Sequence, residues 1–212
     1  MTTANKITIA RIMLIPVFVA MALYYGRSVQ HGSPLEWQRW MAIAVFVLAA
    51  ASDGIDGYIA RRYNQKSRLG EVLDPLADKG LLLSGIITLS FSNWGYEFPV
   101  WFPVLIVARD VVILSGTVTL HFLNGSVRVR PSWTGKIATA LQMVAIALCM
   151  LQWNWFQKTL AIGRWRLDFG SLDLAVWLAG FFTLVSGFGY VVRGIAQLHD
   201  KGHGNPKSWK EI

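Results

Sequence analysis

The stretch SDGIDGYIARRYNQKSRLGEVLDPLADKG, residues 52–80, carries four aspartates inside a chain that is otherwise strongly apolar. Asp53 and Asp56 are three residues apart, and Asp74 and Asp78 are four apart, so each pair shares one face if its segment is helical. The residues between the pairs include Asn-Gln-Lys-Ser, which is typical of a short turn. The stretch therefore predicts an antiparallel pair of helices whose acidic faces can meet.

The composition around this stretch indicates a membrane protein. Hydrophobic residues make up 54% of the 212 residues and charged residues only 15%, which leaves too little polar surface for a soluble domain of this length. A transmembrane helix needs about 20 mostly apolar residues. The segments that meet this requirement lie at 8–25, 38–61, 70–92, 98–122, 134–153 and 174–197.

The predicted fold is therefore all-α, a polytopic membrane domain over residues 1–198 with six transmembrane helices, followed by a polar tail over 199–212. Near the N-terminus, Asn5, Thr8 and Arg11 recur at three-residue intervals and would share one helical face. We expect this polar face on a short interfacial helix that precedes the first span.

Lysine and arginine residues predict the orientation, because they mark the cytoplasmic side of short loops. With the N-terminus inside, most of the 20 Lys and Arg residues fall on the cytoplasmic side. This places both termini and the four aspartates at that face. Because the basic residues line one membrane face, the net charge of +8 favours anionic lipid headgroups or phosphorylated substrates as partners and does not indicate nucleic acid.

Four carboxylates in one small volume repel each other and lose hydration. A central aspartate in a membrane helix costs about 2.5–3.5 kcal/mol on insertion scales, so the cluster needs a neutralising partner. Mg²⁺ or Mn²⁺ bind carboxylate, water and phosphate oxygens, and the stretch has no Cys or His to favour zinc. A salt-bridge network with Arg61, Arg62 and Lys79 is the alternative, although the glycines of the stretch favour a ligand that approaches the backbone.

The stretch also matches a longer pattern, D-x2-D-G-x2-A-R-x8-G-x3-D-x3-D, at Asp53, Asp56, Gly57, Ala60, Arg61, Gly70, Asp74 and Asp78. The pattern resembles the signature of the CDP-alcohol phosphatidyltransferases, and the likeness extends along most of the chain. The resemblance implies six transmembrane helices, a divalent-metal site at the cytoplasmic end, and transfer of a phosphatidyl group from a CDP-lipid such as CDP-diacylglycerol to an alcohol.

The resemblance further implies roles for the acidic residues. Asp53, Asp56 and Asp74 would bind the metal ion that holds the diphosphate, and Asp78 would share in metal binding and act as the catalytic base. The acceptor hydroxyl, deprotonated by Asp78, would attack the phosphorus that carries the lipid, and CMP would leave.

The same resemblance implies a binding site for the CDP-lipid. Its small residues would let the cytidine nucleotide lie close to the helices, and Arg61 would pair with a phosphate. The residues of this expected site are Asp53, Asp56, Gly57, Ala60, Arg61, Gly70 and Asp74.

The acceptor site is predicted from residues outside the stretch. Arg109 lies inside the fourth span, where an arginine more often lines a polar cavity than faces lipid. An arginine suits a phosphate, so we expect Arg109 to bind the acceptor phosphate together with Lys136 at the mouth of the fifth span. A buried ion pair with the adjacent Asp110 is the alternative.

Two acceptors fit the sequence. The N-x2-T-x2-R opening resembles family members whose acceptor is glycerol-3-phosphate, and we favour that alcohol. Phosphatidylglycerol, the acceptor in cardiolipin synthesis, is the second candidate, because Ala138 stands where members of the first group often have a lysine. A homodimer is compatible with the resemblance, although no sequence feature marks an interface.

Functions of other classes fit less well. A membrane prenyltransferase usually carries two separated acidic motifs, and this chain has both aspartate pairs on one predicted hairpin. An aspartate-lined cation transporter is the non-enzymatic alternative. Transporters often show repeated halves and broken helices, and neither is evident in the sequence.

Overall fold

The computed structural model describes the backbone of residues 3–62, 68–124, 133–153, 157–162 and 165–200. Within these segments, the side chains of residues 3–5, 53–62, 68–72, 75, 120–124, 157–162, 165–169 and 195–200 are outside the description. Of the predicted tail, only the backbone of His199 and Asp200 is described, at the end of the last helix. The boundary at residue 198 therefore stays a prediction.

The described chain forms six helices and one two-stranded hairpin. The helices confirm the helical class expected from the sequence, and each predicted span falls largely on one of them. The elements are α1 (Thr3–Gln30), α2 (Glu36–Arg62), α3 (Arg68–Phe91), α4 (Trp101–Asn124), α5 (Trp133–Leu151), β1 (Gln157–Ile162), β2 (Trp165–Gly170) and α6 (Ser171–Asp200).

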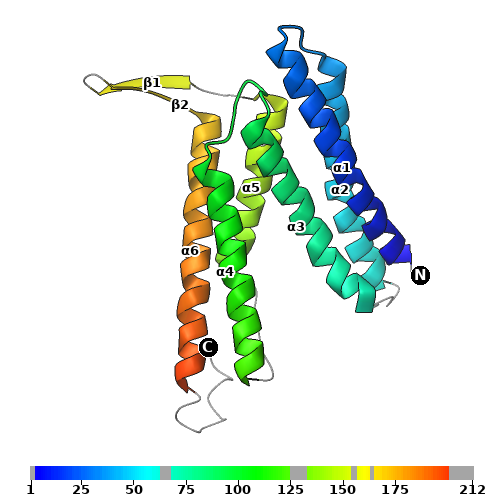
Figure 1. Ribbon diagram of the computed structural model, residues 1–212, viewed down its shortest axis with the longest axis vertical. Coiled ribbons are helices and arrows are strands. Elements are labelled where there is room, and N and C mark those ends of the chain that lie inside the picture. The colour runs from blue at the N-terminus through cyan, green and yellow to red at the C-terminus, as the bar shows by residue number, and fades with distance from the viewer. Residues whose placement is uncertain (1–2, 63–67, 125–132, 154–156, 163–164, 201–212) are drawn as a thin grey trace.

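The hairpin between α5 and α6 was not expected from the sequence. Its strands β1 and β2 are antiparallel, with Gln157 opposite Gly170 and Ile162 opposite Trp165. The hairpin extends sideways from the start of α6, at one end of the molecule (Figure 1). It occupies the connection between the last two helices, so the membrane-spanning part of the fold remains helical.

Four of the helices are long and apolar enough to cross a membrane. The qualifying segments, found among the described residues, are Lys6–Gln30, Trp101–Thr119, Trp133–Leu151 and Ser171–Gly194. Large apolar side chains also cover the outside of the molecule, with Leu114 66% and Phe188 74% exposed. Such a surface is a liability in water and is suited to lipid, so the protein is an integral membrane protein.

The N-terminal region differs from its expected form. The structure has a single continuous helix, α1, in place of a short interfacial helix followed by a first span. Pro16, a residue type that often ends or kinks a helix, lies well inside α1 and does not interrupt it. The polar residues Thr8 and Arg11 are fully buried, so they face other helices of the protein and not a membrane surface.

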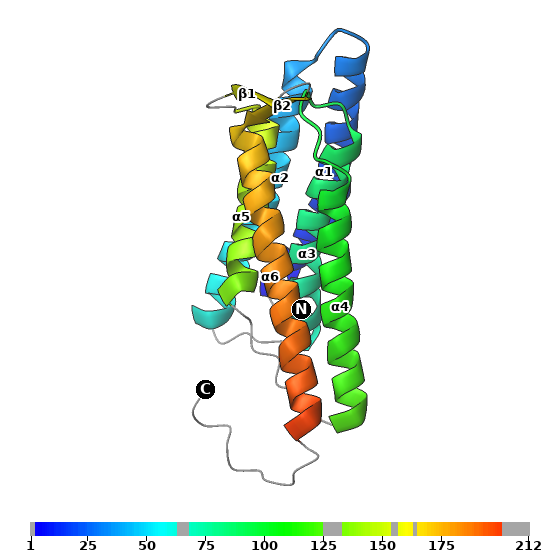
Figure 2. The same ribbon diagram turned by 90° about the vertical axis from the view of Figure 1, so that its left-hand side faces the viewer.

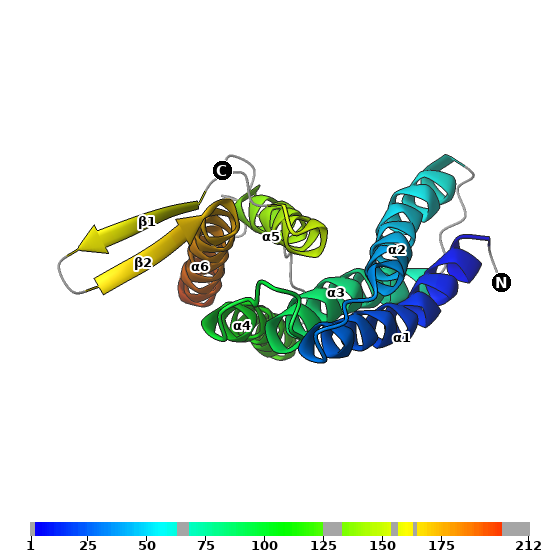
Figure 3. The ribbon, with the colours of Figure 1, turned by 90° about the horizontal axis from the view of Figure 1, so that it is seen from above.

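The helices form two groups. α1 packs on α2 and α3, and α6 packs on α4 and α5, as the view along the helices shows (Figure 3). The C-terminal end of α3 lies close to α4, whereas the N-terminal end of α3 lies farther from it (Figure 1). The N-terminal end of α3 lies at the same end of the molecule as the C-terminal ends of α2, α4 and α6 (Figures 1 and 2).

The two groups meet through close packing in the middle of the molecule. Gly85 of α3 lies against α2 and α5: a Cβ atom added there would be 3.2 Å from Ile146 Cδ1 and 3.3 Å from Phe46 Cε2. Phe46 in turn packs on Phe18 of α1, with ring centroids 5.2 Å apart. The small residue on α3 therefore lets three helices approach one another.

A polar network joins the helices at the end away from the aspartates. Gln152, just after α5, donates hydrogen bonds to the Tyr25 hydroxyl (3.2 Å) and the Trp94 carbonyl (2.8 Å) and accepts one from Arg39 (2.7 Å). Trp94 Nε1 donates to the Ala22 carbonyl at 3.0 Å. Gln152 has a φ of 53°, an uncommon conformation for a residue with a side chain, so its contacts hold the backbone there.

The start of α6 is fixed by Asp173. Its carboxylate accepts a hydrogen bond from the Gly170 N–H at 2.8 Å, as the third residue of a helix does in a capping box. It accepts a second bond from the Tyr96 hydroxyl at 2.7 Å. Burial and this bond raise the pKa of Tyr96, so the phenol stays protonated and continues to donate at neutral pH.

We expect Gln152→Ala to destabilise the protein by about 1–2 kcal/mol, because it removes three hydrogen bonds and keeps a side chain at positive φ. The measurement is the thermal unfolding midpoint in detergent. Gln30→Ala, at an exposed position near the end of α1, is the matched control and should change the midpoint little. Equal midpoints for the two variants would show that the network contributes nothing to stability.

Candidate active site

α3 places two of the four predicted acidic residues on one face. Asp74 and Asp78 lie four residues apart within this helix, and both are half-buried. Asp74 Oδ1 accepts a hydrogen bond from the Thr8 hydroxyl of α1 at 2.7 Å. The helical spacing expected for the second aspartate pair is therefore present, with a partner for Asp74 that comes from the N-terminal helix.

The other predicted residues of the motif lie where only the backbone is described. Asp53, Asp56, Gly57, Ala60 and Arg61 belong to α2, and Gly70 belongs to α3. α2 ends and α3 begins at the same end of the molecule (Figure 1), as expected for an antiparallel pair. The side chains of these residues fall outside the described part, so their roles in metal and CDP-lipid binding stay predictions.

The donor set that the structure does describe fits a hard cation. Among the described side chains, no group of three or more His, Cys, Asp or Glu residues forms a metal site. The side chains of two of the four predicted ligands, Asp53 and Asp56, are not among those described. Asp74 and Asp78 offer carboxylate oxygens, which Mg²⁺ and Mn²⁺ accept as ligands. The chemistry of these two residues is therefore suited to the predicted ion.

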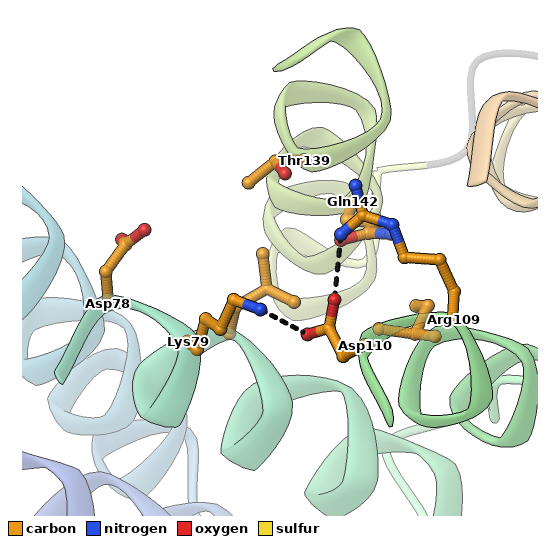
Figure 4. Close-up of a pocket in the computed structure, with 8 residues that line it drawn as sticks. Asp78, Lys79, Arg109, Asp110, Thr139 and Gln142 are labelled. Carbon is orange, nitrogen blue, oxygen red and sulfur yellow. Dashed lines mark hydrogen bonds and ion pairs between the residues drawn. The ribbon is translucent and has the colours of Figure 1, made fainter. Parts of the chain in front are cut away.

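A small pocket lies between α3, α4 and α5 (Figure 4). Its volume is about 70 Å³, which is room for a few water molecules or a small anionic group. Most of its lining side chains are polar or charged. The lining residues are Asp78, Lys79, Leu82, Ile106, Arg109, Asp110, Thr139 and Gln142.

Asp110 holds the two cations of this pocket. Its Oδ2 is 3.2 Å from Lys79 Nζ, and its Oδ1 is 2.8 Å from Arg109 Nη1 (Figure 4). The side chains of Arg109 and Asp110 are 15% and 18% exposed, whereas Lys79 is 52% exposed. Lys79 is therefore the less enclosed of the two cations, so it can move away from Asp110 at a smaller cost in packing than Arg109.

α6 anchors Arg109 from behind the pocket. Arg109 Nη2 donates to Ser186 Oγ at 2.9 Å, and the guanidinium lies 5.9 Å from the ring centre of Tyr190. Gly187 allows this approach, because a Cβ atom there would be 3.3 Å from Arg109 Cγ. The Arg109–Asp110 ion pair, which the sequence offered as an alternative to a binding role for Arg109, is thus present. Arg109 also lines the pocket.

Lys136, the predicted partner of Arg109, lies in the first turn of α5. Its side chain is exposed, and Nζ is 5.2 Å from the ring centre of Trp133. It is not among the residues that line the pocket, whereas Thr139, three residues further along α5, is. The role of Lys136 in binding the acceptor stays a prediction.

Several residues of the site were not predicted to bind a substrate or to position a ligand, although Lys79 and Asp110 were considered as partners in ion pairs. Lys79, Asp110, Thr139 and Gln142 line the pocket, and Thr8 contacts Asp74. The sequence held a signal for some of them: an acid beside an arginine inside an apolar span, and a threonine on the polar face of α1. Gln142 gave no such signal, since a single amide in a helix is common.

Comparison with known proteins shows the family to which the chain belongs. A family model described as CDP-alcohol phosphatidyltransferase matches residues 1–185. The chain belongs to the CDP-alcohol phosphatidyltransferase family. This confirms the resemblance carried by the aspartate motif, and it makes the protein a membrane-bound transferase of phospholipid biosynthesis.

Three curated members of the CDP-alcohol phosphatidyltransferase family show the extent of the likeness. Each is named CDP-diacylglycerol–glycerol-3-phosphate 3-phosphatidyltransferase. The Bacillus subtilis protein is 33% identical over 88% of this chain and 91% of its own length. The Rickettsia felis protein is 34% identical over 88% of this chain and 91% of its own length. The Escherichia coli K12 protein is 32% identical over 81% of this chain and 87% of its own length.

We expect Asp110→Asn to destabilise this CDP-alcohol phosphatidyltransferase by up to about 3 kcal/mol, because it leaves the mostly buried Arg109 without its counter-charge. The measurement is again thermal unfolding in detergent. Glu36→Gln, which breaks the more exposed ion pair with Arg39, is the matched control and should cost less than about 1 kcal/mol. A larger loss in the control would contradict the assignment of Asp110 as the counter-charge of Arg109.

Proposed function

We propose that the protein transfers the phosphatidyl group of CDP-diacylglycerol to glycerol-3-phosphate, which gives phosphatidylglycerophosphate and CMP. The observation that carries this proposal is the pocket that a carboxylate, Asp78, lines together with two cations, Lys79 and Arg109. Relatives that cover most of the chain carry this reaction in their names. The pocket supplies groups for both ends of the acceptor, a base for the hydroxyl and cations for the phosphate.

Asp53, Asp56, Asp74 and Asp78 would hold the divalent ion, Mg²⁺ or Mn²⁺. The oxygen donors of Asp74 and Asp78 and their helical spacing support this assignment. When bound, the ion would withdraw charge from the diphosphate and make CMP a better leaving group.

Asp78 would act as the base. A general base must lie within hydrogen-bond reach of the proton it removes, and Asp78 faces the same space as Thr139 on the opposite wall (Figure 4). It would take the proton of the acceptor hydroxyl. The oxygen would then form a bond to the phosphorus that carries the lipid, and the bond from this phosphorus to CMP would break.

The acceptor phosphate would bind at Lys79 and Arg109. Arg109 Nε is buried without a hydrogen-bond partner among the described residues, and an unpaired buried donor costs about 1–3 kcal/mol. A phosphate also competes with Asp110 for the half-exposed Lys79. The resting ion pairs would thus keep the cations in place until the anionic acceptor arrives.

We infer that α2 and α3 also cross the membrane, which gives six spans with both termini in the cytoplasm. α3 has 24 residues, and at 1.5 Å per residue it exceeds the hydrocarbon thickness of about 30 Å. The C-terminal ends of α2, α4 and α6, which most of the Lys and Arg residues adjoin in the sequence, lie at the end of the molecule where the aspartate motif joins α2 to α3 (Figure 1), which supports a cytoplasmic site. A homodimer stays a prediction.

The first test is CMP release by the purified protein with CDP-diacylglycerol and Mg²⁺ or Mn²⁺. We expect release to require glycerol-3-phosphate and Asp78→Asn to lower kcat about 10²- to 10⁴-fold, the usual contribution of a general base. Asp173→Asn, remote at the start of α6, is the matched control. Release that requires phosphatidylglycerol would assign the cardiolipin reaction instead, and no release with either acceptor would contradict the proposal.

Arg109→Lys tests the acceptor site. A lysine cannot donate in a fixed fork to both Asp110 and Ser186, so we expect KM for glycerol-3-phosphate to rise about tenfold or more, with KM for CDP-diacylglycerol nearly unchanged. Arg39→Lys, at the other end of the molecule, is the control. Equal increases in both KM values would show that Arg109 does not act on the acceptor.

A further inference from the structure

Thr8 reaches from α1 to the aspartate motif. Its side chain is fully buried, and its hydroxyl donates to Asp74 Oδ1 at 2.7 Å, across 66 residues of sequence. A bond to a carboxylate of this length is a strong, charge-assisted hydrogen bond. The contact thus links the N-terminal helix to one of the predicted metal ligands.

The direction of this hydroxyl differs from that of other threonines in the helices. Thr117, Thr139 and Thr183 each donate to the carbonyl four residues earlier in their own helix, which is the usual local bond for a helical threonine. The Thr8 hydroxyl points to a carboxylate on another helix. Its contact therefore serves Asp74 and is not only a feature of α1.

Arg11 extends the same face of α1 toward α2. It is fully buried, and its Nε donates to Ser52 Oγ at 3.0 Å. Ser52 directly precedes Asp53 in the motif. One face of α1 thus contacts both α2 and α3, the helices that carry the predicted ligands. Arg11 adds a positive charge where α1 meets α2.

We propose that Thr8 is a positioning residue for Asp74, which fixes the carboxylate for the divalent ion. This rests on the proposed function. A bond at Oδ1 holds the rotation of the carboxylate and leaves Oδ2 to face the ion. Ligating carboxylates are commonly held by such outer hydrogen bonds, and their loss typically costs 10- to 100-fold in metal affinity.

The test measures Mn²⁺ binding to the purified protein in detergent, from the electron paramagnetic resonance signal of free Mn²⁺, without substrates. Thr8→Val keeps the shape and removes the hydroxyl. Thr8→Ser and Thr8→Ala form a second pair, since both lose the methyl group and only Ser keeps the hydroxyl. Thr88→Val, a buried threonine of α3 about 21 Å along the helix from Asp74, is the matched control.

We expect Thr8→Val and Thr8→Ala to weaken Mn²⁺ binding about 10- to 100-fold, while Thr8→Ser and Thr88→Val bind as the wild type does. Equal affinities for Thr8→Ser and Thr8→Ala would overturn the positioning role, even if Thr8→Val failed to fold. If Thr8 only filled space through its methyl group, Ser and Ala would behave alike, because both variants lack that group.

The outcomes separate this inference from the proposed function. If the wild type binds Mn²⁺ and releases CMP but the hydroxyl has no effect on affinity, only the role of Thr8 fails. If affinity depends on the hydroxyl but no acceptor supports CMP release, the proposed reaction fails and the role of Thr8 stands. A wild type that binds no Mn²⁺ would overturn both.

Discussion

The cost of placing charge inside a membrane protein governs the arrangement of this molecule. Arg109 and Asp110 lie within an apolar helix, and their pairing offsets much of the desolvation that each would suffer alone. Ser186 and Tyr190 of α6 complete the surroundings of the guanidinium. Because the contacts come from different helices, the packing of α4 on α6 and the electrostatics of the pocket depend on each other.

The same constraint explains why polar residues gather on inward faces. Thr8 and Arg11 sit in a helix whose other residues are mostly apolar, and both are buried against the motif helices. Lys79 is the exception, because about half of its side chain is exposed. The pocket therefore combines a fixed cation with an adjustable one, which suits a site that must bind and then release an anion.

Local patterns in the sequence predicted much of this structure. The apolar runs marked all six described helices, and the four-residue spacing marked the shared face of Asp74 and Asp78 on α3. The continuous α1 was missed because a polar face was interpreted as a membrane surface when it packs on protein. The β1–β2 hairpin was not predicted, since its short strands lie between two long helices. Ser186 lies 77 residues from Arg109, and no local pattern could join them.

The network around Gln152 bears on how stability and turnover depend on different parts of the molecule. It fastens one end of the bundle, where α1, α2, α5 and the segment before α4 meet, while α3 and α4 diverge toward the opposite end. The proposed chemistry lies at that opposite end, so the stabilising network and the proposed site are separated along the length of the bundle. Sequence changes at the fastened end can alter the lifetime of the protein with little effect on turnover, so the two properties can evolve independently.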